Sequence, residues 1–464
     1  MNRRLFILLC IVILVIACLP VPPSSPQMPP TFTPTSTQPL PTASIPNPAP
    51  TQAYTATATV SPPAPTPIIR ETITPVSSKQ PGNIQLRLVQ LKMFKDQSGW
   101  SIDLNGRVLY TKNSGKSWKD VSPGQAPQTE KDAQPIIPAA YFLNSSTAWL
   151  VYLRYDQPLL LLHTTNSGSN WIEAAPLPEI DDSARLAPIS IQFIDEKNGW
   201  LWTQIYPGMH HVYPLLFKTV DGGRNWKLIY KISPGEALPE TTLHGSYSQP
   251  FGDQIFGFFN SQRGIAGTGI LQITSDSGGK WQTILPPPFT GQPVVKNPYV
   301  YVCAPVMKNE VAAVQVLTYE FEHVYNPPGD QFDDIPKAAY LAWTEDSGKN
   351  WTARKAPALI GTLSMFDVQH TWFLGKSVAD PKAPMQLFIS PDQGKSWNLV
   401  AGNSDLPLGS EINWVEAQTG YAIPPSGSRK EHFTHFDLRF PQPGSLYKTE
   451  NGGQTWREIF LELE

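Results

Sequence analysis

The sequence predicts an all-β protein whose folded part is a single seven-bladed β-propeller of four-stranded antiparallel blades. Two observations predict this fold class. An eight-residue pattern suited to a tight turn between strands occurs seven times after residue 83, and a second strand–turn–strand pattern lies upstream of most copies. Repeats of this period indicate an array, and two hairpins per repeat make a four-stranded sheet. We therefore expect each repeat to form one blade.

The first residues have the features of an export signal. Arg3 and Arg4 precede an apolar run over residues 5–16, which at about a dozen residues is too short to span a bilayer comfortably. The run leads into Val15, Ile16, Ala17 and Cys18, which resemble the lipobox of bacterial lipoproteins. The resemblance implies a lipoprotein signal peptide over 1–17 and lipidation of Cys18. An ordinary cleaved signal peptide that contains a cysteine is the alternative.

Residues 18–82 are expected to form a disordered tether. No Asp, Glu, Lys or Arg occurs between residues 5 and 69, and residues 19–81 contain 18 prolines, mostly among Thr, Ser and Ala. Such a stretch buries too little apolar surface to offset the entropy of ordering it, and its proline content favours a semi-rigid polyproline-II-like spacer. The spacer would hold residues 83–464 away from a membrane.

The eight-residue pattern reads Ser/Thr, any residue, Asp/Asn, any residue, Gly, two residues, Trp. An Asp or Asn side chain accepts hydrogen bonds from backbone amides just beyond it, the Gly permits a positive φ, and the Trp begins the next strand. We expect these residues to be structural. The acid or amide and the Trp of the seven copies are Asn113 and Trp118, Asn166 and Trp171, Asp221 and Trp226, Asp276 and Trp281, Asp346 and Trp351, Asp392 and Trp397, and Asn451 and Trp456.

The second pattern is an aromatic residue, an acid or Asn two positions later, then Gly and an aromatic residue. Phe193, Asp195, Gly199 and Trp200 give the clearest copy, and the pattern is degenerate in the fifth repeat, around 306–313. The eight-residue element resembles the Asp-box of bacterial-neuraminidase (BNR) repeats. Together the two patterns are similar to the propellers of the photosystem II assembly and stability factor family. That resemblance implies a non-catalytic, chaperone-like role toward a membrane complex.

Composition and motifs exclude several function classes. The formal net charge of −3 gives no basic footprint for nucleic acid, and three cysteines are too few for a Cys-rich zinc site. Sialidases, which share the Asp-box, need an arginine triad, a Tyr–Glu pair and an Asp acid/base, and the early Arg-Ile-Pro segment usual in them is absent. We expect no catalytic residue, no metal and no cofactor. A sialidase- or endoglucanase-like glycoside hydrolase is the alternative.

Blade topology places the candidate binding residues. Both repeated turns lie on one face of the propeller, so the long connections of the third, fifth and seventh repeats fall on the other face, and long loops on a rigid scaffold often carry binding function. These connections hold five of the eight histidines. The candidates are His210, His211, Tyr213, Glu320, Glu322, His323, Tyr325, Asp330, Asp333, Arg429, Lys430, His432, His435 and Arg439. They fit a protein- or glycan-binding face, and alternatives are a His–carboxylate metal site or merely solvated loops; His163 and His370 are expected to be structural.

The sequence thus predicts an extracytoplasmic propeller, lipid-anchored to a bacterial membrane at the cell surface or in the periplasm. Its expected role is a non-catalytic binding or assembly-scaffold module of the cell envelope. Its expected partners are the membrane, through the lipid, and an envelope protein or glycan.

Overall fold

The structure, a computed structural model, contains one compact unit over Lys79–Glu464. It describes residues 86–127, 136–154, 157–180, 186–208, 211–231, 256–267, 271–284, 299–303, 305–324, 331–377, 383–402, 404–424 and 445–464. For 206–208, 211–213, 299–301, 319–324 and 331–337 it describes the backbone alone. The lipobox and the tether lie outside the described residues. No helix in the described ranges is long and apolar enough to cross a membrane.

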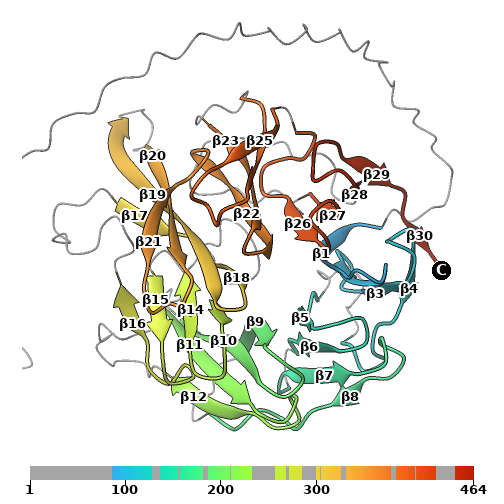
Figure 1. Ribbon diagram of the computed structural model, residues 1–464. Helices are drawn as coiled ribbons and strands as arrows, with labels where there is room; N and C mark the ends of the chain where they lie inside the picture. Colours follow the sequence, from blue (N-terminus) through green and yellow to red (C-terminus); the bar gives the residue numbers. More distant parts are fainter. Residues whose placement is uncertain are drawn as a thin grey trace, which may run out of the picture. The chain divides into compact units, whose positions relative to one another are not determined.

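Seven antiparallel sheets form a β-propeller, as the repeats predict (Figure 1). Blade one contains β1 (Leu88–Met93), β2 (Gly99–Asp103), β3 (Val108–Thr111) and β4 (Ser117–Asp120); blade two contains β5 (Ala139–Phe142), β6 (Ala148–Tyr152), β7 (Leu160–Thr164) and β8 (Ile172–Glu173). Blade three contains β9 (Leu186–Phe193), β10 (Gly199–Gly208), β11 (His211–Thr219) and β12 (Lys227–Lys231); blade four contains β13 (Phe256–Phe258), β14 (Gly264–Gly267), β15 (Leu271–Thr274) and β16 (Gln282–Ile284).

The remaining blades follow the same order, with one exception. Blade five contains β17 (Tyr299–Val302), β18 (Val306–Lys308), β19 (Val311–Val324), β20 (Gln331–Thr344) and β21 (Thr352–Lys355); blade six contains β22 (Ile360–Asp367), β23 (His370–Lys376), β24 (Gln386–Ser390) and β25 (Asn398–Ala401); blade seven contains β26 (Glu411–Trp414), β27 (Gly420–Ile423), β28 (Leu446–Thr449) and β29 (Arg457–Ile459). In blade five the inner strand is broken, because β17 and β18 both pair with β19. This break explains why the second pattern is degenerate there.

The seven eight-residue turns join the third and fourth strand of each blade, and the turn of blade three shows their chemistry. The Thr219 hydroxyl donates to Asp221 Oδ1 at 2.9 Å and accepts from the Gly223 amide at 2.9 Å, and the Asn225 amide donates to Asp221 at 3.0 Å. Gly223 has φ +87°, and a Cβ there would approach Trp149 Nε1 to 3.1 Å. Partial burial acts to raise the pKa of Asp221, but these hydrogen bonds outweigh it and hold the pKa below its usual value.

The hydrophobic core lies between the blades. Seven clusters of buried apolar residues each join two neighbouring blades, and the last of them joins blade seven to blade one. The tryptophans of the second pattern reinforce these joints through the indole N–H. Trp149 donates to the Gly222 carbonyl at 2.8 Å, Trp200 to Ser277 at 2.9 Å and Trp372 to Gly452 at 3.2 Å, each in a turn of the next blade.

The tryptophans of the eight-residue turns are less uniform than expected. Trp118, Trp226, Trp281 and Trp456 are buried, whereas Trp171, Trp351 and Trp397 are half-buried. Trp226 donates to the carbonyl of Gly223 in its own turn at 3.0 Å. The expected burial of the ring is therefore complete in four blades and partial in three.

A short C-terminal strand helps to close the propeller. β30 (Glu462–Leu463) runs parallel to β4, at the outer edge of blade one. The Glu462 amide donates to the Lys116 carbonyl at 3.1 Å and the Glu464 amide to the Trp118 carbonyl at 2.9 Å. Asn413 Oδ1 accepts from the Met93 amide at 2.6 Å, which joins the inner strands of blades seven and one.

Candidate functional site

The structure places the predicted binding residues only in part. His210, Tyr325, Asp330, Arg429, Lys430, His432, His435 and Arg439 lie outside the described residues. The backbone alone is described for His211 and Tyr213 in β11, for Glu320, Glu322 and His323 in β19, and for Asp333 in β20. Pairing of β19 with β20 sets Glu322 opposite Asp333 and His323 opposite Phe332. Whether these candidates form one site stays a prediction.

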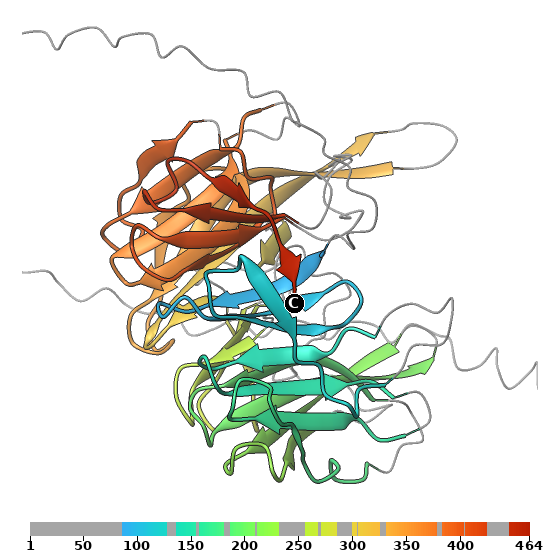
Figure 2. The ribbon, with the colours of Figure 1, turned by 90° about the vertical axis from the view of Figure 1, so that its right-hand side faces the viewer.

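The long connections of blades three and five were expected to be loops, and this was wrong for much of their described length. β10 and β11 continue pairing to Gly208 and His211, and β19 and β20 continue to Val324 and Gln331. We call the paired ends of these strands the hairpin arms of blades three and five. Figure 2 shows that both arms point to the same side of the propeller, and that the arm of blade five extends well beyond its blade. Two paired strands satisfy each other's backbone groups, which explains why the polar sequence here forms a hairpin.

The arm of blade five carries a bulge and an uncovered edge. Thr318 pairs with Ala338 and Tyr319 with Pro336, so Lys337 is left over between them. On the other side of β20, pairing with β21 ends where Tyr340 meets Lys355, and only a 3.4 Å hydrogen bond from the Ala356 amide to the Ala339 carbonyl continues it. Within the described residues, β20 from Gln331 to Ala338 therefore has one neighbouring strand instead of two.

A cavity of about 590 Å³ lies at the foot of this edge, between blades five and six. Its lining is Ala338, Ala339, Tyr340, Ala353, Arg354, Lys355, Ala356, Pro357, Ala358, Leu359 and Ser377. Five alanines leave the space open. Among the described residues, two cations and no carboxylate contribute to the lining, and Lys355 is exposed. Sequence reasoning missed this site. The available signal was the run of alanines on both sides of the fifth eight-residue turn, where other blades place larger residues.

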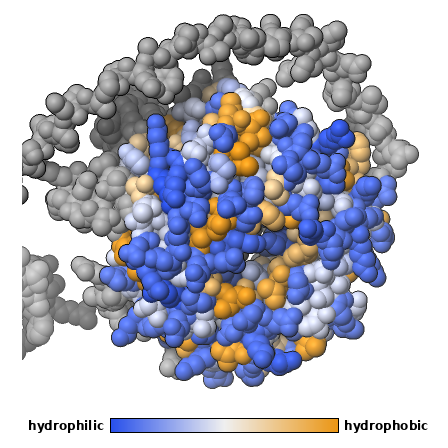
Figure 3. Space-filling view, in the orientation of Figure 1, coloured by the Kyte–Doolittle hydropathy of each residue, from blue (hydrophilic) through white to orange (hydrophobic). Residues whose placement is uncertain are grey.

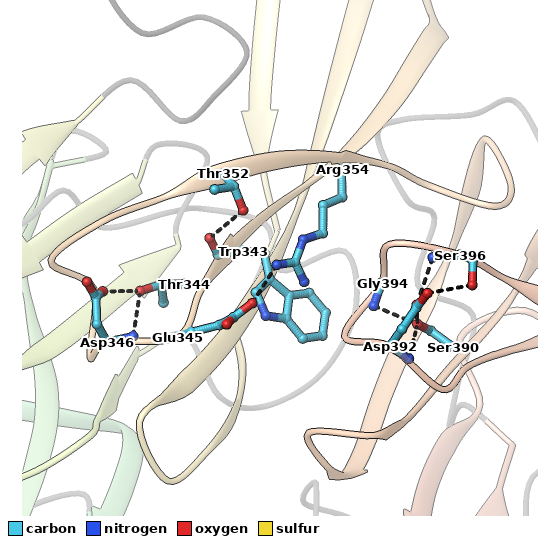
Figure 4. A network of polar contacts seen from close by, with 10 residues as sticks. All are labelled: Trp343, Thr344, Glu345, Asp346, Thr352, Arg354, Ser390, Asp392, Gly394 and Ser396. Carbon is cyan, nitrogen blue, oxygen red and sulfur yellow. Dashed lines mark hydrogen bonds and ion pairs between the residues drawn. The ribbon is translucent and has the colours of Figure 1, made fainter. Parts of the chain in front are cut away.

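Arg354, which lines the cavity, belongs to a network of polar contacts (Figure 4). Arg354 Nη2 lies 2.6 Å from Glu345 Oε1, and its guanidinium lies over the Trp343 ring, 4.7 Å from the centroid. The Arg354 side chain is only 9% exposed, and a Cβ on Gly394 of blade six would approach its Cδ to 3.6 Å. Arg354 therefore joins blades five and six, which leaves Lys355 as the lining cation accessible to a ligand.

A second charged group lies on the inner strands. Lys92 of β1, Lys308 of β18 and Glu411 of β26 are all exposed. Lys92 is surrounded by protein even though its side chain reaches solvent. This desolvation lowers the pKa of Lys92, Lys308 lowers it further, and Glu411 opposes the shift.

Figure 3, seen from the face opposite the hairpin arms, shows separate apolar patches among hydrophilic residues rather than one continuous apolar surface.

Five of the described arginines make local contacts. Arg107 pairs with Asp103, Arg154 donates to the Pro158 carbonyl, and Arg263 donates to the Ser347 carbonyl. Arg224 and Arg354 are likewise engaged, by the Asp221 carbonyl and by Glu345. Among the described residues, no three His, Cys, Asp or Glu side chains are grouped closely enough to hold a metal ion.

Comparison with known proteins shows a likeness of fold. The structure of YCF48 bound to D1 peptide aligns with a TM-score of 0.42 and 13% identity, over 79% of this chain and 92% of that one. YCF48 from Cyanidioschyzon merolae gives a TM-score of 0.38 at 13% identity, over 79% and 96%. The GH74 enzyme of Niastella koreensis gives 0.32 at 13% identity, over 80% and 62%. No protein-family model and no curated protein matches the sequence.

Proposed function

We propose that this protein is a lipid-anchored, extracytoplasmic binding module that holds an envelope protein on the face that carries the hairpin arms. One observation carries the proposal: the two extended arms project from the same side, and the larger one has an open cavity at its foot. The repeated turns on the opposite face have a structural role, because their hydroxyl and Asp or Asn side chains are engaged in hydrogen bonds within each turn. Binding surfaces commonly concentrate on such extensions of a rigid scaffold.

Photo-crosslinking in cells that produce the full chain tests the proposal. A photoreactive amino acid replaces Glu322 or Asp333 in the arm of blade five, and controls carry it at Val220 or Leu399. Val220 lies in a turn of the opposite face and is 65% exposed, and Leu399 lies on an outer strand and is 56% exposed. We expect one adduct of defined mass from the arm positions and none from the controls. Equal adducts at all four positions, or none, would contradict the proposal.

A panel of fluorogenic glycosides tests the glycoside hydrolase alternative on the same purified chain. The binding-module proposal expects no turnover above that of a heat-denatured sample. Turnover that disappears on Glu322→Gln or Asp333→Asn would overturn it in favour of catalysis at two carboxylates, as in glycoside hydrolases.

The anchor is tested at Cys18. Cys18→Ala removes the thiol that would be lipidated. Since the acyl chains attached there would supply the apolar area that anchors the protein, we expect the variant to leave the membrane fraction. Cys10→Ala lies within the expected signal peptide and serves as the matched control that stays anchored. A Cys18→Ala protein that remains anchored to the membrane by a lipid would contradict the proposal.

A further inference from the structure

Among the described residues, the part of β20 that precedes Ala339 is an open edge. β20 has a neighbour on both sides where it pairs with β21, and on one side only before Ala339, because pairing with β21 ends at Lys355. In blade three, β11 is likewise paired on one side only before Leu215. An open strand edge presents unpaired backbone N–H and C=O groups, which makes it a template for pairing with another chain. Pro336 interrupts it, as proline often does at strand edges.

The cavity lies where this edge begins. Its volume of about 590 Å³ falls within the range typical of ligand pockets, about 300–1,000 Å³. Ala338 belongs to both the edge and the cavity, and Ala339 next to it also lines the cavity, so a chain that pairs along the edge would place side chains directly at the cavity mouth. Specificity in strand addition arises in this way, from pockets that accept alternate side chains.

The charge of the lining selects the partner's chemistry. Lys355 is exposed at the cavity, Arg354 adds a second positive charge that Glu345 largely balances, and the described residues of the lining include no carboxylate. A carboxylate near a bulky apolar residue therefore complements the site, and complementary charge favours specificity and rapid association. A lysine in the same position would be repelled.

We infer that the free edge of β20 and the cavity at its foot bind an extended segment of a partner protein by strand addition. A bulky apolar side chain of the segment fills the cavity, and an adjacent acidic residue pairs with Lys355. The inference rests on the proposed function, in which the face that carries the hairpin arms holds the partner. It adds that the edge of β20 and the cavity make the main contact with that partner.

Selection of peptides tests the inference on the full chain in detergent. A displayed library of random ten-residue peptides is selected for binding to the protein, and the affinity of the selected peptides is measured by fluorescence anisotropy. We expect the selected peptides to contain a bulky apolar residue next to an acidic one. We also expect a selected peptide to lose binding when its alternate backbone amides are N-methylated. Absence of any enriched peptide, or unchanged binding after N-methylation, would overturn the inference.

Two variants locate the site. Ala353→Trp fills the cavity from an exposed strand position, and we expect this variant to bind the selected peptides at least 10-fold more weakly. Leu399→Trp is the matched control, because Leu399 occupies the equivalent position two residues after the turn tryptophan in blade six, and it should leave affinity unchanged. Lys355→Glu should weaken acidic peptides and strengthen versions with lysine in place of the acid. Equal loss in Ala353→Trp and Leu399→Trp would overturn the inference.

The outcomes separate this inference from the proposed function. If the arm positions Glu322 and Asp333 still give their adduct in an Ala353→Trp chain, the binding-module proposal stands and the cavity is not the site. If light scattering shows a dimer that Ala353→Trp abolishes while no peptide is selected, the occupant is a second copy of this chain and the inference is wrong.

Discussion

At the residue scale, tryptophan side chains pack between neighbouring blades and stabilise their contacts. Trp226 is 7% exposed, packs edge-on to Phe193 with ring centroids 6.0 Å apart, and belongs to the cluster that joins blades two and three. Trp149 stacks on Phe193 from the neighbouring blade at 3.6 Å. These aromatic contacts add to the hydrophobic effect of burial, and such pairs typically contribute about 0.5–1.5 kcal/mol each.

Trp226→Ala should therefore lower the free energy of unfolding by about 3–5 kcal/mol, the usual cost of truncating a buried aromatic residue. Urea unfolding followed by circular dichroism measures the change. Leu399→Ala is the control, since Leu399 is exposed and such substitutions typically change stability by less than about 0.5 kcal/mol. An unchanged unfolding midpoint in Trp226→Ala would show that this ring is not part of the core.

His163 gives the same joint a dependence on pH. Its imidazole stacks on Trp149 at 4.9 Å, as a structural role predicts. Burial lowers the pKa of His163, Arg224 lowers it further, and Glu196 partly opposes the shift. The unfolded chain, with an ordinary pKa of about 6.5, binds this proton more readily than the folded one. The stabilising contribution is thus complete above that value and is lost as pH falls through it toward the folded pKa.

We expect the free energy of unfolding to fall between pH 8 and pH 5 by less in His163→Phe than in the unchanged protein. Phe keeps an aromatic ring on Trp149 and cannot take up a proton. Unfolding in urea at the two pH values measures the difference. An identical pH dependence in both proteins would mean that His163 does not contribute to it.

At the element scale, the eight-residue turns explain why the repeat could be recognised from sequence. The first residue of each turn places a hydroxyl against the amide of the Gly four positions later, as in Thr219 to Gly223 and Ser390 to Gly394. The Asp or Asn then accepts amides from the far side of the turn. All these bonds are local, so short sequence patterns are enough to specify them.

Thr219→Val should destabilise the protein by about 1–3 kcal/mol, because it leaves the buried Gly223 amide without an acceptor while conserving side-chain shape. Thr219→Ser is the matched control, since Ser390 fills the same position in blade six, and it should retain most of the stability. Thermal unfolding of the two variants measures the difference. If both variants melt together, the hydroxyl does not hold the turn.

At the scale of the whole molecule, the joint between blades one and seven closes the ring between the first and the last repeat. Its buried apolar cluster contains Leu91, Met93 and Trp118 from blade one and Tyr421 and Leu446 from blade seven. β30 adds two backbone hydrogen bonds and a contact between the Ser117 hydroxyl and the Glu464 carboxylate. Phe460, which precedes this strand, is 85% exposed, so the strand is held by its edge and by Leu461 rather than by deep burial.

Glu462→Pro removes the amide that donates to the Lys116 carbonyl. We expect the free energy of unfolding to fall by about 1–2 kcal/mol, which lowers the melting temperature by several degrees. Hydrogen exchange should rise in β4 before it rises in the other outer strands. Glu462→Ala retains the amide and is the control. Unchanged exchange in β4 would show that β30 does not secure the closure.

The amino-acid sequence by itself determined the number of blades, the order of strands within them and the position of every eight-residue turn. These features depend on local hydrogen bonds and on an apolar pattern that each repeat carries within itself. It also placed the candidate residues in the third, fifth and seventh repeats, and that they form a binding face stays a prediction. Only the tertiary structure decided that two of these connections continue as paired strands, that the inner strand of blade five is broken, and that β30 closes the molecule at β4. The cavity at Ala338 and Lys355 belongs to this second group, because it arises where one strand outlasts its neighbour. Such mismatches depend on pairing between distant segments, which short patterns do not encode.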